Sequence, residues 1–254
     1  DTNILSYNDF LDRSDWAVSA LQWALGSGVL DSDGANLNAR KTVTQAEAAA
    51  AQLLTGIAGN SALTETEKAL LLHDRLAVRC EYDTGVYTAA GAGADARNIY
   101  GALVERTAVC DGYSRAYQYL LQKAGIGCRI VRSQQLNHSW NIVEIGGVPY
   151  HVDVTFDDPV DDMTGYVTHD HFLLSSAALY SRRHAAGDYD VSPADTRYDD
   201  YFWRDSHAAF TLAGGMIHYI DAQEDWDVCM NTEYIKYVHK LHDEHSVRMG
   251  HGSA

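Results

Sequence analysis

The chain has 254 residues, of which 46% are apolar and 21% charged, and its 35 acidic and 19 basic side chains give a formal net charge of −16. A globular chain of this length can bury a full core without disulfides or metal ions. The acidic balance, with no run of Lys or Arg, excludes a nucleic-acid partner and disfavours an anionic membrane surface. No apolar stretch approaches the roughly 18 residues of a membrane span. The sequence begins at Asp1 without a basic and then apolar leader, so we expect any secretion signal to have been removed or never to have existed.

The cysteines are scattered along the chain and none has CxxC spacing. This argues against a zinc ribbon and against a dense disulfide framework. They are Cys80, Cys110, Cys128 and Cys229.

Residues 1–58 predict a small helical unit of two short helices and a loop. Apolar residues recur at helical spacing before Gly28, and residues 44–47 (TQAE) form a capping box that predicts the start of an alanine-rich helix reaching about Gly56. The apolar residues of the first helix are Trp16, Ala20, Trp23 and Ala24.

This unit resembles an S-layer homology (SLH) repeat. The matching segments are residues 7–9 (YND), 15–17 (DWA), Gly28, 33–34 (DG) and 43–47 (VTQAE). Gln45 stands where the family has Arg, and one repeat is present where three are usual. The resemblance implies a secreted or cell-surface protein of a Gram-positive-like bacterium, with cell-wall polysaccharide as a partner. The alternative is a helical pair that docks on the next domain.

A second unit, predicted over residues 61–198, opens with another capping box. Residues 64–67 (TETE) predict a helix that continues to about Arg79. Residues 84–97, rich in Gly and Ala, predict a loop, and residues 98–106 a short helix. The predicted buried stripe of the first helix is Ala69, Leu72, Leu76 and Ala77.

Cys110 opens the most strongly periodic stretch of the chain. The periodicity predicts a helix that starts near Cys110 and ends at Gly125. Unpaired N–H groups and the positive end of the helix dipole favour a thiolate there, and the same N–H groups can stabilise an oxyanion. Cys110 is therefore a candidate nucleophile, and the alternative is a small packing residue. The apolar face comprises Tyr113, Ala116, Tyr117, Leu120, Leu121 and Ala124.

Two strand-like runs, residues 138–145 and 148–154, flank Gly146 and Gly147, which predict a two-residue hairpin turn. Opposite residues then have numbers that sum to 293, so Asp153 faces Trp140 and is a diagonal neighbour of His138. Such neighbours lie within about 7–8 Å at Cβ, which an imidazole and a carboxylate can bridge. The hairpin thus predicts a histidine base oriented by an acid.

These motifs resemble, in order, those of bacterial members of the transglutaminase-like superfamily over about residues 61–185. The matching segments are residues 109–113 (VCDGY), 125–126 (GI), 138–143 (HSWNIV) and 150–159 (YHVDVTFDDP). The resemblance implies an α+β, papain-like fold in which the helix carrying the cysteine packs on an antiparallel sheet. It also implies a catalytic triad of Cys110, His138 and Asp153.

Two positions depart from the family pattern. Phe156 and Pro149 stand where the family often has Trp, and we expect neither to touch the triad. Tyr100 is our candidate for a second oxyanion donor, and the alternative for Tyr100 is a core tyrosine on a short helix.

The predicted function is that of a thiol enzyme that acts on peptide or protein amide bonds through a thioester, by hydrolysis or by acyl transfer, without a metal or cofactor. The alternative is a non-catalytic surface module that binds cell wall or protein. Several histidines fall close together, but their spacing is not diagnostic of a metal site, and we expect none. They are His151, His169, His171 and His184.

Residues 199–254 predict a C-terminal extension. Gly214 and Gly215 separate two strand-like pieces, which predicts a hairpin appended to the main sheet. His239, His242 and His245 are one helical turn apart and are expected on a solvated helix face, while residues 248–254 are expected to be loose.

Overall fold

A computed structural model describes residues 39–219 apart from 90, 161–164, 183, 186 and 189–191, and the side chains only from residue 45 onward. The first predicted helix, Cys229, and the predicted histidine face at residues 239–245 lie outside the described residues. Among the described residues, no helix is both long and apolar enough to cross a membrane.

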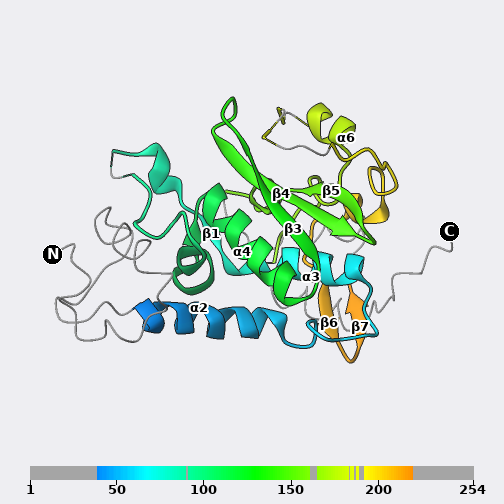
Figure 1. Ribbon diagram of the computed structural model, residues 1–254, viewed down its shortest axis with the longest axis horizontal. Helices are drawn as coiled ribbons and strands as arrows, with labels where there is room; N and C mark the ends of the chain where they lie inside the picture. The colour runs from blue at the N-terminus through cyan, green and yellow to red at the C-terminus, as the bar shows by residue number, and fades with distance from the viewer. Residues whose placement is uncertain are drawn as a thin grey trace, which may run out of the picture.

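The centre of the molecule is a helix on an antiparallel sheet, as predicted. Strands β3 (Gly127–Ser133), β4 (His138–Ile145) and β5 (Val148–Val152) follow one another in the sheet, and helix α4 (Cys110–Lys123) packs on it (Figure 1). The described part of the chain therefore has a mixed α+β architecture. Strand β3 was not among the predicted elements.

The β4–β5 hairpin has the predicted register. Asn141 pairs with Val152 and Ile145 with Val148, and the turn residues Gly146 and Gly147 have φ values of 58° and 78°, which glycine adopts without strain. The strand ends at Val152, earlier than predicted. It ends there because the Asp153 side chain caps the single-turn helix α5 (Val154–Asp157).

Helix α3 (Glu65–Arg79) begins with the predicted capping box. The Thr64 hydroxyl accepts from the Glu67 backbone N–H at 3.2 Å, and the Thr64 N–H donates to the Glu67 carboxylate at 2.8 Å. The predicted stripe is buried, and so are Leu70 and Leu71 between its members. The helix is therefore covered on more sides than an amphipathic surface helix would be.

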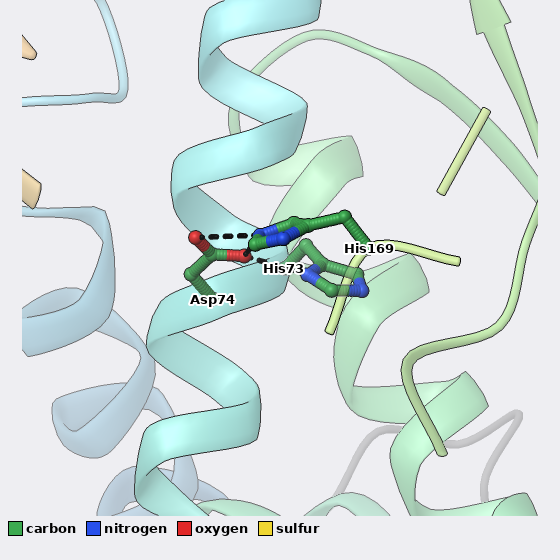
Figure 2. Close-up of side chains that lie close together, drawn as sticks. All are labelled: His73, Asp74 and His169. Carbon is green, nitrogen blue, oxygen red and sulfur yellow. Dashed lines mark hydrogen bonds and ion pairs between the residues drawn. The ribbon is translucent and has the colours of Figure 1, made fainter. Parts of the chain in front are cut away.

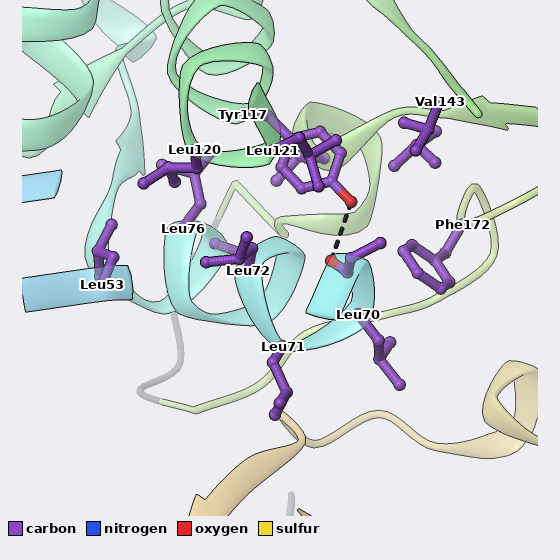
Figure 3. Packing of buried hydrophobic residues seen from close by; sticks show 14 of the residues in the cluster. Leu53, Leu70, Leu71, Leu72, Leu76, Tyr117, Leu120, Leu121, Val143 and Phe172 are labelled. Atoms are coloured by element: carbon purple, nitrogen blue, oxygen red, sulfur yellow. Dashed lines mark hydrogen bonds between the residues drawn. The ribbon is translucent and has the colours of Figure 1, made fainter. Parts of the chain in front are cut away.

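Leucines of α3 and α4 form the main core together with side chains from the sheet (Figure 3). The Tyr117 hydroxyl of α4 donates to the Ala69 carbonyl of α3 at 2.9 Å. This buried hydrogen bond fixes how α4 lies against α3, and so where the first turn of α4 points. The helix ends at Gly125 as predicted, in a Schellman arrangement: the Ile126 N–H donates to the Leu121 carbonyl at 2.9 Å.

Helix α2 (Ala39–Leu54) contributes Ala49, Ala50 and Leu53 to this same core, and Figure 1 shows it running beside α4. The predicted capping box at residues 44–47 is wrong, because the helix already begins at Ala39 and Thr44 lies inside it. The predicted boundary near residue 58 stays a prediction.

The segment before Cys110 is less regular than predicted. Instead of an α-helix over residues 98–106, a π-helical turn η5 (Gly101–Glu105) ends at Arg106, whose φ of 62° is left-handed. Two short strands, β1 (Glu81–Tyr82) and β2 (Thr107–Ala108), lie on either side of this turn in the sequence and pair in parallel. A 3-10 turn η4 (Thr84–Tyr87) lies in the predicted loop.

The described C-terminal part includes α6 (Ser176–Ser181), η6 (Phe202–Asp205) and a hairpin of β6 (Thr211–Ala213) and β7 (Met216–His218). The hairpin turns at Gly214 and Gly215 as predicted. It does not extend the main sheet, however. It forms a two-stranded sheet of its own whose first strand contacts α3.

Candidate active site

Cys110 is the first residue of α4, as its sequence position predicts. Val109 occupies the N-cap position, and its apolar side chain makes no cap bond to the N–H groups of the first turn. The backbone is anchored just before this point, because the Val109 N–H donates to the Ala96 carbonyl at 2.9 Å. The thiol therefore lies at the positive end of a 14-residue helix.

Gly112 makes this anchoring possible. A Cβ atom at position 112 would come within 2.5 Å of the Ala96 carbonyl oxygen and 2.7 Å of the Ala108 Cβ. Since two of the three nearest atoms belong to backbone carbonyls, they cannot swing aside as a long side chain would. The glycine in the motif VCDGY thus allows the loop at residue 96 to approach the first turn of α4.

The structure brings His138 and Asp153 into direct contact. His138 is the first residue of β4, and its Nε2 lies 2.6 Å from Asp153 Oδ2. Asp153 Oδ1 accepts from the N–H groups of Thr155 and Phe156 at 3.1 and 3.3 Å. These backbone bonds fix the carboxylate because Asp153 is an N-cap residue, a role that the predicted longer strand did not include.

Cys110 and His138 form a pair with opposite pKa changes. Burial alone would raise the pKa of the Cys110 thiol, but its hydrogen bond to His138, the charge of that ring and contacts with Ser139 leave the pKa below its ordinary value. Burial would lower the pKa of His138, whereas the charge and hydrogen bond of Asp153, followed by Cys110, raise it to about 10. The arrangement therefore favours a thiolate beside an imidazolium.

The other described cysteines behave in the opposite way. Burial raises the pKa of Cys80 and of Cys128 to about 12. None of the three described cysteines forms a disulfide. Cys110 is thus the one thiol among them that the protein environment activates.

Two aromatic rings pack against His138. Phe156 lies at a ring-centroid distance of 4.7 Å, and Trp140 stacks at 5.9 Å. The expectation that Phe156 does not touch the triad is therefore wrong: Asp153 caps α5, and the helical turn places the third residue after the cap over the imidazole. Pro149 pairs with Glu144 in the middle of the hairpin, away from these contacts.

The structure does not place Tyr100 with the triad. The Tyr100 hydroxyl donates to the Gln45 side chain of α2 at 3.0 Å, and Tyr100 is not among the residues that line the cleft at Cys110. Tyr82, which the sequence analysis missed, does line that cleft. It gets there because β1 pairs in parallel with β2, which sets Tyr82 opposite Ala108, two residues before the thiol.

The cleft beside Cys110 has a volume of about 350 Å³ and is mostly apolar. Among the residues that line the cleft, Arg97 carries a permanent positive charge. Its guanidinium lies 3.4 Å from the Asp111 carboxylate. Arg132 lies 3.6 Å from the same carboxylate, so the charge of Asp111 is balanced and does not oppose the neighbouring thiolate. The lining residues are Tyr82, Val86, Tyr87, Arg97, Val109, Cys110, Leu136, Asn137, His138, Thr155, Phe156 and Val160.

A second group of histidines and aspartates surrounds His73, and Figure 2 shows three of its buried members, His73, Asp74 and His169. His73 Nδ1 is 2.7 Å from Asp74 Oδ1, and its Nε2 is 3.2 Å from Asp157 Oδ2. His169 Nε2 lies 3.0 Å from Asp74 Oδ1, and His171 Nδ1 lies 3.1 Å from Asp157 Oδ1. The histidines that the sequence singled out near residue 170 therefore bind carboxylates.

Two sets of side chains in the described part of the chain have the composition of a metal site. The first is His73 with Asp74 and His169, and the second is His138 with Asp153 and His184. Bonds of 2.0–2.1 Å at tetrahedral angles hold the ligand atoms of a zinc ion about 3.3 Å apart. In the second set, both imidazole nitrogens lie closer than that to Asp153 Oδ2, at 2.6 and 2.7 Å. These are hydrogen-bond distances, so neither histidine needs an ion to explain its position.

Comparisons with known proteins agree with the geometry. The profile of the transglutaminase-like superfamily matches residues 51–167, which include Cys110, His138 and Asp153. No comparison supports an SLH repeat at the N-terminus. No protein of curated function matches this chain.

Two solved structures show partial similarity. One, described as a TGase, has 14% identity and a TM-score of 0.39 over 46% of this chain. The other, described as a candidate cysteine protease from Cytophaga hutchinsonii, has 17% identity and a TM-score of 0.32 over 62% of this chain. The chain spans 33% and 48% of those two proteins. Over residues 51–167, the chain is similar to the transglutaminase-like superfamily.

Proposed function

We propose that this chain is a thiol enzyme that acts on amide bonds of peptides or proteins, with Cys110 as nucleophile, His138 as general base and acid, and Asp153 as the residue that orients the imidazole. One observation carries the proposal. His138 is bonded to Asp153 through Nε2 at 2.6 Å, and it lines the same cleft as the thiol of Cys110, which lies at the N-terminus of a helix. With Nε2 on the carboxylate, Nδ1 is the ring nitrogen that serves the thiol.

The reaction follows from these positions. The Cys110 thiolate adds to the amide carbonyl carbon, and the carbonyl electron pair moves onto oxygen to form a tetrahedral oxyanion. As the C–N bond breaks, the His138 imidazolium passes its proton to the leaving amine, and a thioester remains. Water or an amine then loses a proton to His138 and attacks the thioester, which gives hydrolysis or a new amide and restores the thiol.

Two donors serve the oxyanion in this proposal. One is the backbone N–H of Cys110 in the uncapped first turn of α4. The other is the Tyr82 hydroxyl: the Tyr87 hydroxyl donates to the Tyr82 oxygen at 3.4 Å, which leaves the Tyr82 proton for the substrate. Tyr82 also lies near enough to Cys110 that the thiolate charge helps to raise the Tyr82 pKa, after burial and the contact with Tyr87.

The cleft favours an acyl group flanked by apolar or aromatic side chains. Its walls near the thiol include Val86, Leu136, Phe156 and Val160, and a volume of about 350 Å³ holds about one or two side chains at a time. Secretion to the surface of a Gram-positive-like bacterium and binding to cell-wall polysaccharide stay predictions that rest on the N-terminal pattern.

Turnover of defined peptides tests the proposal. Peptides with glutamine between apolar residues, matched peptides with glutamine between acidic residues, and peptides without glutamine are incubated with and without a labelled primary amine. We expect ammonia release, amine incorporation or backbone cleavage with the apolar series, and at least a thousandfold less with Cys110→Ala. Equal rates for Cys110→Ala, or no reaction with any peptide, would overturn the proposal and favour a binding module.

A further inference from the structure

Asp153 is bonded to a second imidazole that lies outside the matched residues 51–167. His184 Nε2 lies 2.7 Å from Asp153 Oδ2, the same oxygen that His138 Nε2 approaches at 2.6 Å. Since Oδ1 already accepts from the N–H groups of Thr155 and Phe156, the carboxylate has four donors. Each of its two oxygens is held from two directions.

The His184 ring is itself tightly held. The residue is 5% exposed, and aromatic rings surround it: Phe156 at 4.5 Å, Trp140 edge-on at 5.3 Å and His138 at 5.9 Å. Its Nδ1 is buried and has no hydrogen-bond partner among the described residues. A proton on Nδ1 would be a buried donor without an acceptor, so Nε2 is the nitrogen that carries the proton and donates to Asp153.

Other titratable groups near Asp153 and Cys110 have partners or roles of their own. Burial lowers the pKa of His151 to about 3, so this ring is neutral near neutral pH. His171, whose ring lies 5.1 Å from that of His184, is bonded to Asp157. Tyr82 faces Cys110 from β1. Among the described residues, His184 and His138 are the two side chains that bind the Asp153 carboxylate directly.

We propose that His184 is a positioning residue for the reaction: its Nε2–H holds Asp153 Oδ2 behind His138, so that the imidazolium beside the Cys110 thiolate stays supported. This inference rests on the proposed function. The backbone N–H groups hold only Oδ1, and the terminal torsion of an aspartate is soft. Without His184, the carboxylate can turn Oδ2 away from His138, and the imidazolium then loses part of its support.

Two substitutions separate the donor from the ring. His184→Phe keeps an aromatic ring in its place but removes the N–H group, whereas His184→Gln loses the ring but offers a side-chain N–H in nearly the same position. His218→Phe is a matched control, because His218 on β7 is buried to a similar degree, at 6% exposed, and contacts none of the triad residues. If His184→Phe does not fold, as judged by thermal unfolding, His184→Ala takes its place.

The readout is the pH dependence of Cys110 alkylation by iodoacetamide, followed by mass spectrometry of the labelled peptide. We expect His184→Phe to move the midpoint upward by about one pH unit, with alkylation about tenfold slower below the midpoint. His184→Gln returns the midpoint to the wild-type value, and His218→Phe leaves it unchanged. A midpoint that stays or falls in His184→Phe, or that His184→Gln does not restore, would overturn the inference.

The same measurement distinguishes this failure from failure of the proposed function. If alkylation of the folded wild-type protein has the midpoint of the denatured chain, the thiol is not activated and the proposed function fails. If the wild-type midpoint is lowered and His184→Phe shares it, the triad stands and only the role of His184 is lost.

Discussion

At the scale of single residues, the site keeps three charges in a buried place by alternating their signs. The Cys110 thiolate, the His138 imidazolium and the Asp153 carboxylate each depend on their neighbour, because burial disfavours every one of them taken alone. The pKa of Asp153 lies below its ordinary range despite burial, since the charge and hydrogen bond of His138, with further support from His184, favour the carboxylate. Loss of any one of these three groups therefore makes the charged forms of the other two less favourable.

Tyr82 gives the first prediction at this scale. Tyr82→Phe removes the hydroxyl that we assign to the oxyanion but leaves the ring in the cleft wall. We expect kcat on a peptide substrate to fall roughly 100- to 1,000-fold with little change in KM, as for loss of one oxyanion donor. Alkylation of Cys110 by iodoacetamide forms no oxyanion, so its rate should stay at the wild-type value.

The comparison of the two rates is the control for Tyr82→Phe. An unchanged kcat would show that Tyr82 does not serve the oxyanion. An equal fall in turnover and alkylation would show instead that the substitution disturbs the thiol. Tyr100→Phe, which removes a hydroxyl bonded to Gln45 on α2, is expected to leave kcat unchanged.

At the scale of elements, the position of the thiol depends on the close approach of α4 and the loop before it. Gly112→Ala would place a Cβ 2.5 Å from the Ala96 carbonyl, so the first turn of α4 or the loop must shift. We expect a loss of stability of about 1–3 kcal/mol, as for overpacked sites, and a larger relative loss of alkylation rate. Urea unfolding and iodoacetamide kinetics on the same sample measure both.

Gly125→Ala is the matched substitution at the other end of α4. Nothing lies within 4 Å of a Cβ at position 125, but its φ of 82° strains an alanine there. We expect a comparable loss of stability without a change in the alkylation rate. If both variants alkylate equally fast, the approach at Gly112 does not position the thiol.

Some of the elements that form the site could be predicted from the sequence, and others could not. The hairpin was predictable because a two-glycine turn fixes the register of β4 and β5, and that register makes His138 and Asp153 neighbours. The start of α3 was predictable from a local capping box. Tyr82 was not, because β1 and β2 are two residues long and pair across distant parts of the chain, so neither has a detectable period.

His184 was found in the sequence but not assigned to Asp153 for a similar reason. The two residues are 31 positions apart and do not share a helix or a strand, so no helical or strand spacing relates them. Phe156 was misjudged because the sequence continued β5 to residue 154, whereas Asp153 ends the strand by capping α5. A strand would have pointed Phe156 away from His138, but the helical turn brings it over the ring.

At the scale of the whole molecule, a buried ion network joins α3 to the segments after the β4–β5 hairpin. Both ring nitrogens of His73 face carboxylates, from Asp74 and Asp157. Burial would lower the pKa of His73, but its bonds to Asp157 and Asp74 raise it to about 9. The pKa values of Asp74 and Asp157 are lowered despite burial, by His169 and His73 at Asp74 and by His171 and His73 at Asp157.

These shifts predict how stability depends on pH. A histidine whose pKa rises from about 6.5 to about 9 on folding stabilises the protein fully below pH 6.5, and this contribution is lost as the pH rises through 9. The lowered aspartate pKa values stabilise the protein above about pH 4, and that contribution is lost in acid. We expect the thermal midpoint to be highest between about pH 4 and 6.5 and to fall by roughly 5–10 °C by pH 10.

His73→Gln tests the origin of the alkaline fall. It leaves two buried carboxylates without their shared cation, so we expect a loss of about 3–5 kcal/mol at pH 6 and a smaller fall of the midpoint between pH 6 and 10. Calorimetry across this range measures both. A midpoint that rises toward pH 10, or the same slope in both proteins, would contradict the assignment.

The rate of Cys110 alkylation by iodoacetamide at pH 7 tests the central claim most directly. Mass spectrometry locates the label, and Cys110→Ala identifies the thiol that is being measured. We predict that folded wild-type protein reacts at Cys110 at least about tenfold faster than the denatured chain, that His138→Ala abolishes the difference, and that Cys80 and Cys128 stay unlabelled in the folded state. A folded protein that reacts no faster than the denatured chain, or that reacts equally fast without His138, would contradict the account.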